Sequence, residues 1–270
     1  MNLIDDHQIT ITGTGDRTIL FSHGFGGDQS MFRYLVEAFA PDYRCVTYNL
    51  AGAGPAAPGR FRRERYRDLR GYAADVIAIC EELQLQDVIH VGHSVSAMIG
   101  VLAANDRPDL FSSLVLIGPS ARYINDGDYY GGFSAEDIEE LLEVMGSNYL
   151  GWSARMGPAI MGNAERPALG EELAGSFQKT DPEIARFFAR VTFTSDNRAD
   201  LPKVSVPSLI LQCDEDIIAP EAVGRYVHAH IPGSRFVLLK ARGHCPNISE
   251  PAQTSAAIRT FLNELSTAAA

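Results

Sequence analysis

Ser94 stands at an abrupt change of pattern, where an apolar run over residues 88–91 is followed by small residues and then by a helical pattern. A serine on a sharp turn from strand to helix has its hydroxyl group pushed out of the sheet, and the next backbone N–H points to where an oxyanion would form. The usual pattern for such a turn is Gly-x-Ser-x-Gly, of which Gly92 supplies the first glycine while Ser96 replaces the second. A serine in a turn is most often a helix cap or a solvated hydroxyl, but the preceding glycine and the place between an expected buried strand and a helix favour a nucleophile.

A nucleophilic serine needs a base that accepts its proton and a carboxylate that orients the base. In open α/β sheets the reactive loops gather beyond the carboxyl ends of the strands. Asp216 follows a strand expected over residues 208–212, and His244 follows one expected over residues 236–240. Serine, acid and histidine thus come in the chain order of the α/β-hydrolases. The residues predict acyl transfer through Ser94, with His244 as the base and Asp216 as the acid.

Other side chains compete for these roles. Asp214 and Glu215 stand in the same loop as Asp216, and a carboxylate in a surface turn is the simplest interpretation of all three. His93 adjoins the serine, but the turn is expected to point it away, which favours a structural role. His7, His23 and His90 are also expected to be structural. His228 and His230 are two residues apart on one helix and face different directions, so they predict no metal pair.

Two backbone amides are candidates for an oxyanion hole. One belongs to Val95, directly after the serine, and the other to Phe25, in the glycine-rich segment 23–27. Taken alone, the glycines of this segment are equally consistent with a flexible turn, whereas next to a nucleophilic Ser94 an oxyanion hole is favoured. No phosphate-binding glycine motif stands between a strand and a helix, so no cofactor is expected.

Strands and helices alternate over both ends of the chain. Apolar runs and period-two alternation predict further strands over residues 8–11, 18–21, 44–48 and 113–117. Helical spacing predicts helices over residues 30–38, 71–83, 95–104, 220–230 and 251–265, with Ser30 as the cap of the first. This alternation predicts an α/β fold with a doubly wound, mostly parallel central sheet and helices on both faces.

Between residues 119 and 197 the alternation stops, and helical periodicity continues without clear strands. Helices are expected there over residues 134–145, 148–161, 170–178 and 182–189. We therefore expect a core domain of residues 1–118 and 198–270, with residues 119–197 inserted as a four-helix lid. The last residues, 266–270, are expected to fray.

The composition argues against several classes of protein. A net charge of −11 opposes binding to nucleic acids and anionic membranes, and no apolar run is long enough to span a bilayer. The first residues carry acids rather than the features of a signal peptide, so we expect a cytoplasmic protein. The four scattered cysteines are expected to be buried apolar side chains, and one basic stretch is expected to form a solvated surface: Arg60, Arg62, Arg63, Arg65, Arg67 and Arg70.

Several separate segments resemble known hydrolases. Residues Phe25–Met31, Gly92–Gly100, Tyr129–Phe133 and Leu211–Pro220 resemble the RsbQ family of bacterial stress-response regulators, and Gly92–Met98 is also similar to the plant strigolactone and karrikin receptors. The resemblance covers the whole chain within the α/β-hydrolase fold. It implies a serine hydrolase with a Ser-Asp-His triad and a lid over a largely apolar cavity, which acts on or senses a small hydrophobic ester or lactone. The spacing of Asp216 to Pro220 matches the family pattern, so Asp216 is preferred to Asp214 as the acid.

The same resemblance implies residues around the substrate and a protein partner. Phe25, Phe133, Phe193 and Ile217 are expected to line the cavity, with Trp152 from the lid, although aromatic residues at helical spacing are equally consistent with packing inside the lid. RsbQ-like proteins act upstream of a stress sigma factor through a serine/threonine phosphatase with a PAS domain, so such a phosphatase is the implied partner. Two functions stay open: an enzyme that turns over an ester or lactone, and a receptor that binds or slowly cleaves a small molecule and signals to a protein.

Overall fold

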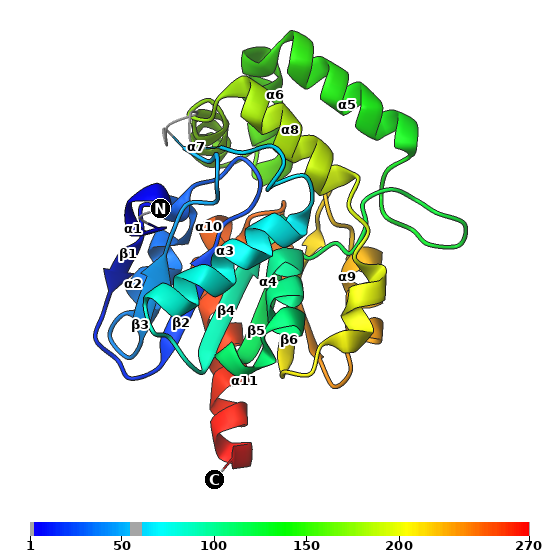
Figure 1. Cartoon of the computed structure of the whole chain (residues 1–270). Coiled ribbons are helices and arrows are strands. Elements are labelled where there is room, and N and C mark those ends of the chain that lie inside the picture. Colours follow the sequence, from blue (N-terminus) through cyan, green and yellow to red (C-terminus); the bar gives the residue numbers. More distant parts are fainter. Residues whose placement is uncertain (1–2, 55–60, 270) are drawn as a thin grey trace.

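The computed structural model describes residues 3–54 and 61–269; Pro55, Arg60 and Ala270, which fall in segments discussed above, lie outside the described residues. Within this part of the chain, a seven-stranded sheet with the order β1-β3-β2-β4-β5-β6-β7 forms the centre of the fold (Figure 1). Only β1 is antiparallel to its neighbour, β3, and the other neighbouring pairs are parallel. The predicted mostly parallel sheet is therefore confirmed. The strands are β1 (Thr10–Thr12), β2 (Thr18–Ser22), β3 (Arg44–Thr47), β4 (Val88–His93), β5 (Phe111–Ile117), β6 (Ser208–Glu215) and β7 (Arg235–Arg242).

Helices cover both faces of the sheet because its central strands are apolar on both sides. On β5, Leu114 and Leu116 face one apolar cluster while Val115 and Ile117 face another. The first cluster includes residues of α3 (Leu69–Glu82), α4 (Val95–Asp106) and α9 (Glu221–His230). The second includes residues of α2 (Arg33–Phe39) and α11 (Pro251–Ala269). The sheet thus holds the ends of its strands rigidly between two layers of helices.

Most predicted elements are present with shifted ends. The helix expected to be capped by Ser30 begins as a 3-10 turn, Gln29–Phe32. Its N-cap is Asp28, whose carboxylate accepts the backbone N–H of Ser30 at 2.9 Å, so the expected cap is wrong. The end of the chain, expected to fray, is helical through Ala269 as the last part of α11. Two short helices are present that the sequence pattern does not predict, α1 (Leu3–Asp6) and α10 (Pro246–Ser249).

Four cap helices lie together beyond one end of the sheet and connect β5 to β6 (Figure 1). They are α5 (Ala135–Ser147), α6 (Tyr149–Met161), α7 (Pro167–Phe177) and α8 (Pro182–Phe193). Helices α6 and α7 approach closely because both carry a glycine at the contact: a Cβ added at Gly157 would lie 2.6 Å from the carbonyl oxygen of Gly170. The inner faces of the cap helices form an apolar cluster that extends to Met31, Ile218 and Cys245. The division into core and lid stays a prediction.

The described arginines of the basic stretch lie exposed at the surface, as predicted. Arg63, Arg65, Arg67 and Arg70 each pair with a carboxylate. The four cysteines, Cys45, Cys80, Cys213 and Cys245, are buried and free, which confirms the prediction of buried apolar side chains.

Over residues 3–54 and 61–269, none of the helices combines the length and apolar character that crossing a membrane requires. Over the same residues, no group of three or more His, Cys, Asp or Glu side chains is placed to hold a metal ion.

Candidate active site

The turn at Ser94 has an unusual backbone conformation. Strand β4 ends at His93 and α4 begins at Val95, so Ser94 alone makes the turn, with φ of 57° and ψ of −124°. A positive φ is uncommon outside glycine and is concentrated at functional turns. Glycine is required at Gly92 because a Cβ there would lie 2.3 Å from the backbone oxygen of Ser96. The predicted turn from strand through serine to helix is therefore present.

Three side chains from the ends of β4, β6 and β7 form one hydrogen-bonded chain. The Ser94 hydroxyl lies 2.7 Å from Nε2 of His244, and Nδ1 of His244 lies 2.7 Å from Oδ2 of Asp216. Because a carboxylate only accepts, Nδ1 carries the proton and Nε2 accepts the serine O–H. The other carboxylate oxygen of Asp216 accepts the backbone N–H groups of Ile218, at 2.8 Å, and Ala219, at 3.0 Å. All three side chains are buried, so the orientation and the tautomer of His244 are fixed.

The two competing acids face away from this chain. Asp214 accepts the backbone N–H of Ala241 at 3.1 Å. Glu215 lies with its Oε1 3.3 Å from Nε of Arg242. Both contacts are directed to β7, so the structure brings Asp216, and neither of its neighbours, to His244.

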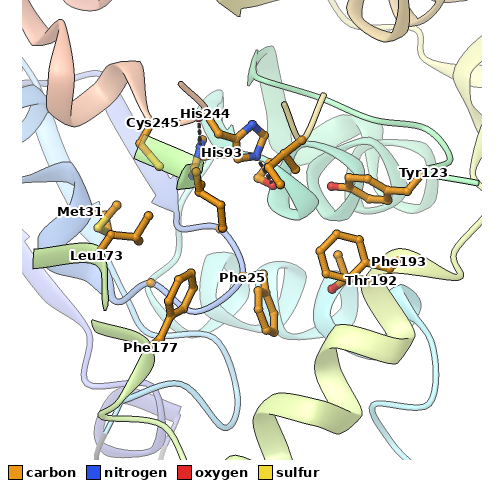
Figure 2. A pocket seen from close by; sticks show the side chains of 15 residues that line it. Phe25, Met31, His93, Tyr123, Leu173, Phe177, Thr192, Phe193, His244 and Cys245 are labelled. Atoms are coloured by element: carbon orange, nitrogen blue, oxygen red, sulfur yellow. Dashed lines mark hydrogen bonds between the residues drawn. The ribbon is translucent and has the colours of Figure 1, made fainter. Parts of the chain in front are cut away.

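His93 does not point away from the site, and that expectation is wrong. Its ring lines the same cavity as Ser94, and its centroid lies 5.0 Å from that of the His244 ring (Figure 2). Burial lowers the pKa of His93 to about 3, so the ring is neutral near neutral pH. Its Nε2–H donates to the backbone carbonyl of His244 at 2.7 Å. The bond holds in place the segment that carries the His244 side chain.

The two expected oxyanion donors lie on segments that are joined to each other. Val95 is the first residue of α4, where backbone N–H groups have no acceptor within the helix. Phe25 follows Gly24, and a Cβ added at Gly24 would lie 3.2 Å from Cβ of Ser94, so this loop passes directly beside the serine. Ser96, in the first turn of α4, donates its hydroxyl to the backbone carbonyl of His23 at 2.6 Å. This contact accounts for the serine in place of the second glycine.

His23 anchors the same loop from the other side. Its Nδ1–H donates to the carbonyl of Gly24 at 2.8 Å, and its Nε2 accepts the backbone N–H of Leu50 at 3.0 Å. Burial lowers the pKa of His23 to about 4, which keeps the ring neutral and Nε2 able to accept. The structural role expected for His23 is therefore that of a brace between the loops after β2 and β3.

A largely apolar cavity lies between Ser94 and the cap helices (Figure 2). The cavity, together with the solvent space at its mouth, measures about 490 Å³. Its walls come from the loops at the strand ends and from α6, α7 and α8: Gly24, Phe25, Gly27, Met31, His93, Ser94, Tyr123, Ile160, Leu173, Phe177, Thr192, Phe193, Ile218, His244 and Cys245.

The expected cavity residues divide into three groups. Phe25 and Phe193 line the cavity. Trp152 and Phe133 are placed behind it, Trp152 against the ring of Phe25 at 6.3 Å and Phe133 against that of Phe193 at 6.5 Å. Ile217 is 56% exposed, so its expected place in the cavity is wrong. Asp216 binds the amides of the two residues after Ile217, and this tight turn directs Ile217 outward and the next residue, Ile218, into the cavity.

Several lining residues are not among those that the sequence predicts. Leu173 and Phe177 are four residues apart on α7 and so share a face, which the helical period of the sequence indicates once the helix is assigned. Thr192 stands beside the expected Phe193, and Cys245 beside His244. Being next to a cavity residue in the sequence does not predict that a residue lines the cavity, because neighbouring residues on a helix or in a loop point in different directions.

The comparisons with known proteins agree with this geometry. A family model described as the alpha/beta hydrolase family matches residues 19–257. The chain belongs to the α/β-hydrolase family. This hydrolase is 43% identical to a plant protein described as a probable esterase, from Oryza sativa subsp. japonica, over 93% of its own length and 94% of the relative. It is 39% identical to "Strigolactone esterase D14" of Arabidopsis thaliana, over 97% and 98% of the two chains.

Solved structures extend the comparison to bacteria. A hydrolase from Oleispira antarctica, olei00960, superposes on this α/β-hydrolase with a TM-score of 0.94 at 37% identity, over 97% of this chain and 96% of that one.

Another plant relative, "Karrikin insensitive 2 receptor CA" of Petunia hybrida, is 43% identical over 93% of this chain and 94% of the relative. Membership of the family, together with relatives named as esterases, supports hydrolase activity for the chain.

Proposed function

We propose that the protein is a serine hydrolase that cleaves a small, largely apolar ester or lactone by means of a Ser94-His244-Asp216 triad. One observation carries this proposal: the hydrogen-bonded chain from Asp216 through His244 to Ser94 ends at the wall of an otherwise mostly apolar cavity. A serine hydroxyl bonded to the unprotonated nitrogen of a buried, oriented imidazole is the arrangement that activates a nucleophile.

In the proposed reaction, the Ser94 oxygen attacks the carbonyl carbon of the ester while Nε2 of His244 takes the serine proton. The backbone N–H groups of Val95 and Phe25 stabilise the oxyanion of the tetrahedral intermediate. The C–O bond then breaks, and the leaving alkoxide receives the proton from Nε2 of His244. A water molecule then attacks the acyl-serine while His244 takes its proton, the bond between the acyl carbon and the Ser94 oxygen breaks, and His244 returns the proton to that oxygen as the acid leaves. Asp216 orients His244 and stabilises its positive charge in both steps.

A covalent label and a pair of serine variants test this proposal. A fluorophosphonate is expected to add its mass to Ser94 in the folded protein, and Ser94→Ala is expected to lower kcat for p-nitrophenyl butyrate at least about 1,000-fold. Ser205→Ala is the matched control, because Ser205 is exposed in the loop that precedes β6 and so lies away from the strand ends that carry the site. Full hydrolysis by Ser94→Ala, or no added mass in the wild-type protein, would contradict the proposal.

A receptor role is a second proposal. It is supported by a relative at 43% identity that carries the name "Karrikin insensitive 2 receptor CA". It is also supported by the cavity, part of whose wall is formed by residues of the cap helices α6, α7 and α8. In this proposal, the bound or slowly cleaved molecule changes the cap helices, which then bind a protein partner such as a PAS-domain serine/threonine phosphatase in stress signalling. Affinity capture from the source organism, with and without ligand, is the test. Rapid turnover of a metabolic ester without recovery of any phosphatase or regulator would argue against it.

A further inference from the structure

Two buried hydroxyl groups belong to residues that line the cavity. Thr192 on α8 and Tyr123 are each 1% exposed, and both line the cavity. Neither hydroxyl makes a hydrogen bond of ordinary geometry with any described residue. Burial raises the pKa of Tyr123 to about 12, although the nearby Ser94 hydroxyl acts in the opposite direction. Tyr123 therefore lies beside the nucleophile as a neutral phenol.

The state of Thr192 is unusual for a threonine in a helix. Such a hydroxyl commonly bonds to the carbonyl of the residue four positions earlier. Thr194, two residues later, does so, with its Oγ1 2.8 Å from the carbonyl oxygen of Arg190. Thr192 instead leaves its hydroxyl oxygen buried and without a hydrogen-bond partner among the described residues, in a side chain that lines the cavity. A substrate oxygen that accepts a hydrogen bond from this hydroxyl removes the cost of leaving a buried polar group unpaired.

The cavity is thus different on its two sides. Figure 2 shows Tyr123, Thr192 and Phe193 on one side and Met31, Leu173 and Cys245 on the other. Phe177 lies on the same side as Leu173, and Phe25 lies between the two sides (Figure 2). The wall formed by Met31, Leu173 and Phe177 presents only apolar groups and a thioether, whereas Thr192 and Tyr123 present a hydroxyl each.

We propose that Thr192 is a specificity-determining residue that hydrogen-bonds a second oxygen of the substrate, so that the preferred substrate is an ester or lactone with a carbonyl, ether or hydroxyl oxygen remote from the reacting carbonyl. The inference rests on the proposed hydrolase function and adds the substrate class. The apolar part of such a substrate lies against Met31, Leu173 and Phe177. A purely aliphatic ester of the same shape leaves the Thr192 hydroxyl unpaired, and sites built around a polar contact discriminate strongly against analogues that lack it.

Esters of matched shape test the proposal. The substrates are p-nitrophenyl cyclohexanecarboxylate and the p-nitrophenyl tetrahydropyrancarboxylates with the ring oxygen at each available position, which replace one CH₂ by an ether oxygen. Thr192→Val, which removes the hydroxyl and keeps the shape, is expected to lower the ratio of kcat/KM for the best tetrahydropyran ester to that for the cyclohexane ester about 10-fold. Thr192→Ser is expected to keep the preference. Thr194→Val makes the same chemical change outside the cavity and is expected to change neither value.

The outcomes separate this inference from the proposed function. If wild-type protein cleaves the esters but Thr192→Val keeps the ratio of kcat/KM values at every ring position, the inference is wrong and the hydrolase proposal stands. If wild-type protein cleaves none of them faster than Ser94→Ala, the hydrolase proposal fails, and binding replaces turnover as the measurement. Calorimetry then measures the affinity of the corresponding methyl esters for the Ser94→Ala variant and for the double variant that carries Ser94→Ala and Thr192→Val. An about 10-fold weaker affinity confined to the tetrahydropyran ester supports the inference, and equal affinities overturn it.

Discussion

The hydroxyl of Ser96 donates a hydrogen bond to the backbone carbonyl of His23, at 2.6 Å. Ser96 is fully buried, so this bond is not exchanged with water. It joins the first turn of α4 to the residue that precedes Gly24 and Phe25. The two proposed oxyanion donors, Val95 and Phe25, are thereby held at a fixed separation by a side chain that replaces the second glycine of the usual turn.

Removal of this bond is expected to affect both stability and catalysis. Ser96→Ala leaves the His23 carbonyl buried without its partner, which costs about 1–3 kcal/mol of unfolding free energy, and it is expected to lower kcat more than it changes KM. Urea unfolding and ester kinetics are the measurements. Ser208→Ala removes a partly buried hydrogen bond of a serine to a backbone carbonyl, that of Val206, at the start of β6, and is expected to leave kcat unchanged. A Ser96→Ala protein with wild-type kcat would show that the bond does not position the oxyanion loop.

The neighbouring acids Asp214 and Asp216 allow a matched pair of variants. Asp216→Asn keeps the shape of the side chain but disturbs the tautomer of His244, and a fall in kcat of about 10,000-fold is expected. Asp214→Asn changes a carboxylate that contacts β7 instead, and kcat is expected to stay within a few-fold of wild type. The measurement is the steady-state hydrolysis of one p-nitrophenyl ester by both variants. A larger loss in Asp214→Asn would reverse the assignment of the acid.

Variants of His93 test whether its hydrogen bond to the backbone carbonyl of His244 positions the His244 imidazole. His93→Leu removes the donor to the His244 carbonyl at similar volume, and kcat/KM is expected to fall about 10–100-fold because the imidazole loses its exact placement. His93→Gln retains an N–H donor near the position of Nε2 and is expected to recover most of the activity. Equal activities of the two variants would show that the hydrogen bond has no effect on the site.

Three buried histidines predict how stability depends on pH. Burial lowers the pKa of His23 and of His90 to about 4, and that of His93 to about 3, from the ordinary value of 6.5. Below pH 6.5 the unfolded chain therefore takes up protons that the folded chain does not, and the unfolding free energy falls as the pH falls toward 4. Each ring contributes at most about 1.4 kcal/mol per pH unit in this window.

Urea unfolding at several pH values between about 7.5 and 5 measures this slope. In His90→Gln one of the three rings is absent, so the slope is expected to decrease by the contribution of one proton. A wild-type unfolding free energy that is constant over this range would contradict the prediction, because it would require the same number of bound protons in both states.

Phe177 is expected to limit the size of the substrate. Its ring lines the cavity and packs on Trp152 at 5.1 Å and on Phe25 at 6.0 Å. Phe177→Ala is expected to cost about 3–5 kcal/mol of stability and to shift the preferred acyl chain of p-nitrophenyl esters to greater length. Phe39→Ala, in the apolar cluster of α2 on the sheet, is expected to be similarly destabilising without a change in chain-length preference. An unchanged preference in Phe177→Ala would contradict the assigned limit.

The sequence predicts which loops meet but not how each side chain in them points. Parallel strands bring their carboxyl ends to one edge, and this rule alone predicts that Ser94, Asp216 and His244 come together. Ile217 and Ile218 are equally apolar, and only the turn closed by the Asp216 carboxylate decides which one enters the cavity. The same holds for Thr192 and Thr194, since the direction of a side chain in the cap helices depends on where each helix packs, which no local pattern contains.

The separation of 150 positions between Ser94 and His244 has a consequence for biosynthesis. At about 5–20 residues per second, a ribosome releases the turn with the serine about 8–30 seconds before the histidine that follows β7. Throughout that interval the nascent chain carries a hydroxyl without its base. In the proposed mechanism, reactivity toward esters is therefore acquired only when β7 and the histidine that follows it have joined the sheet.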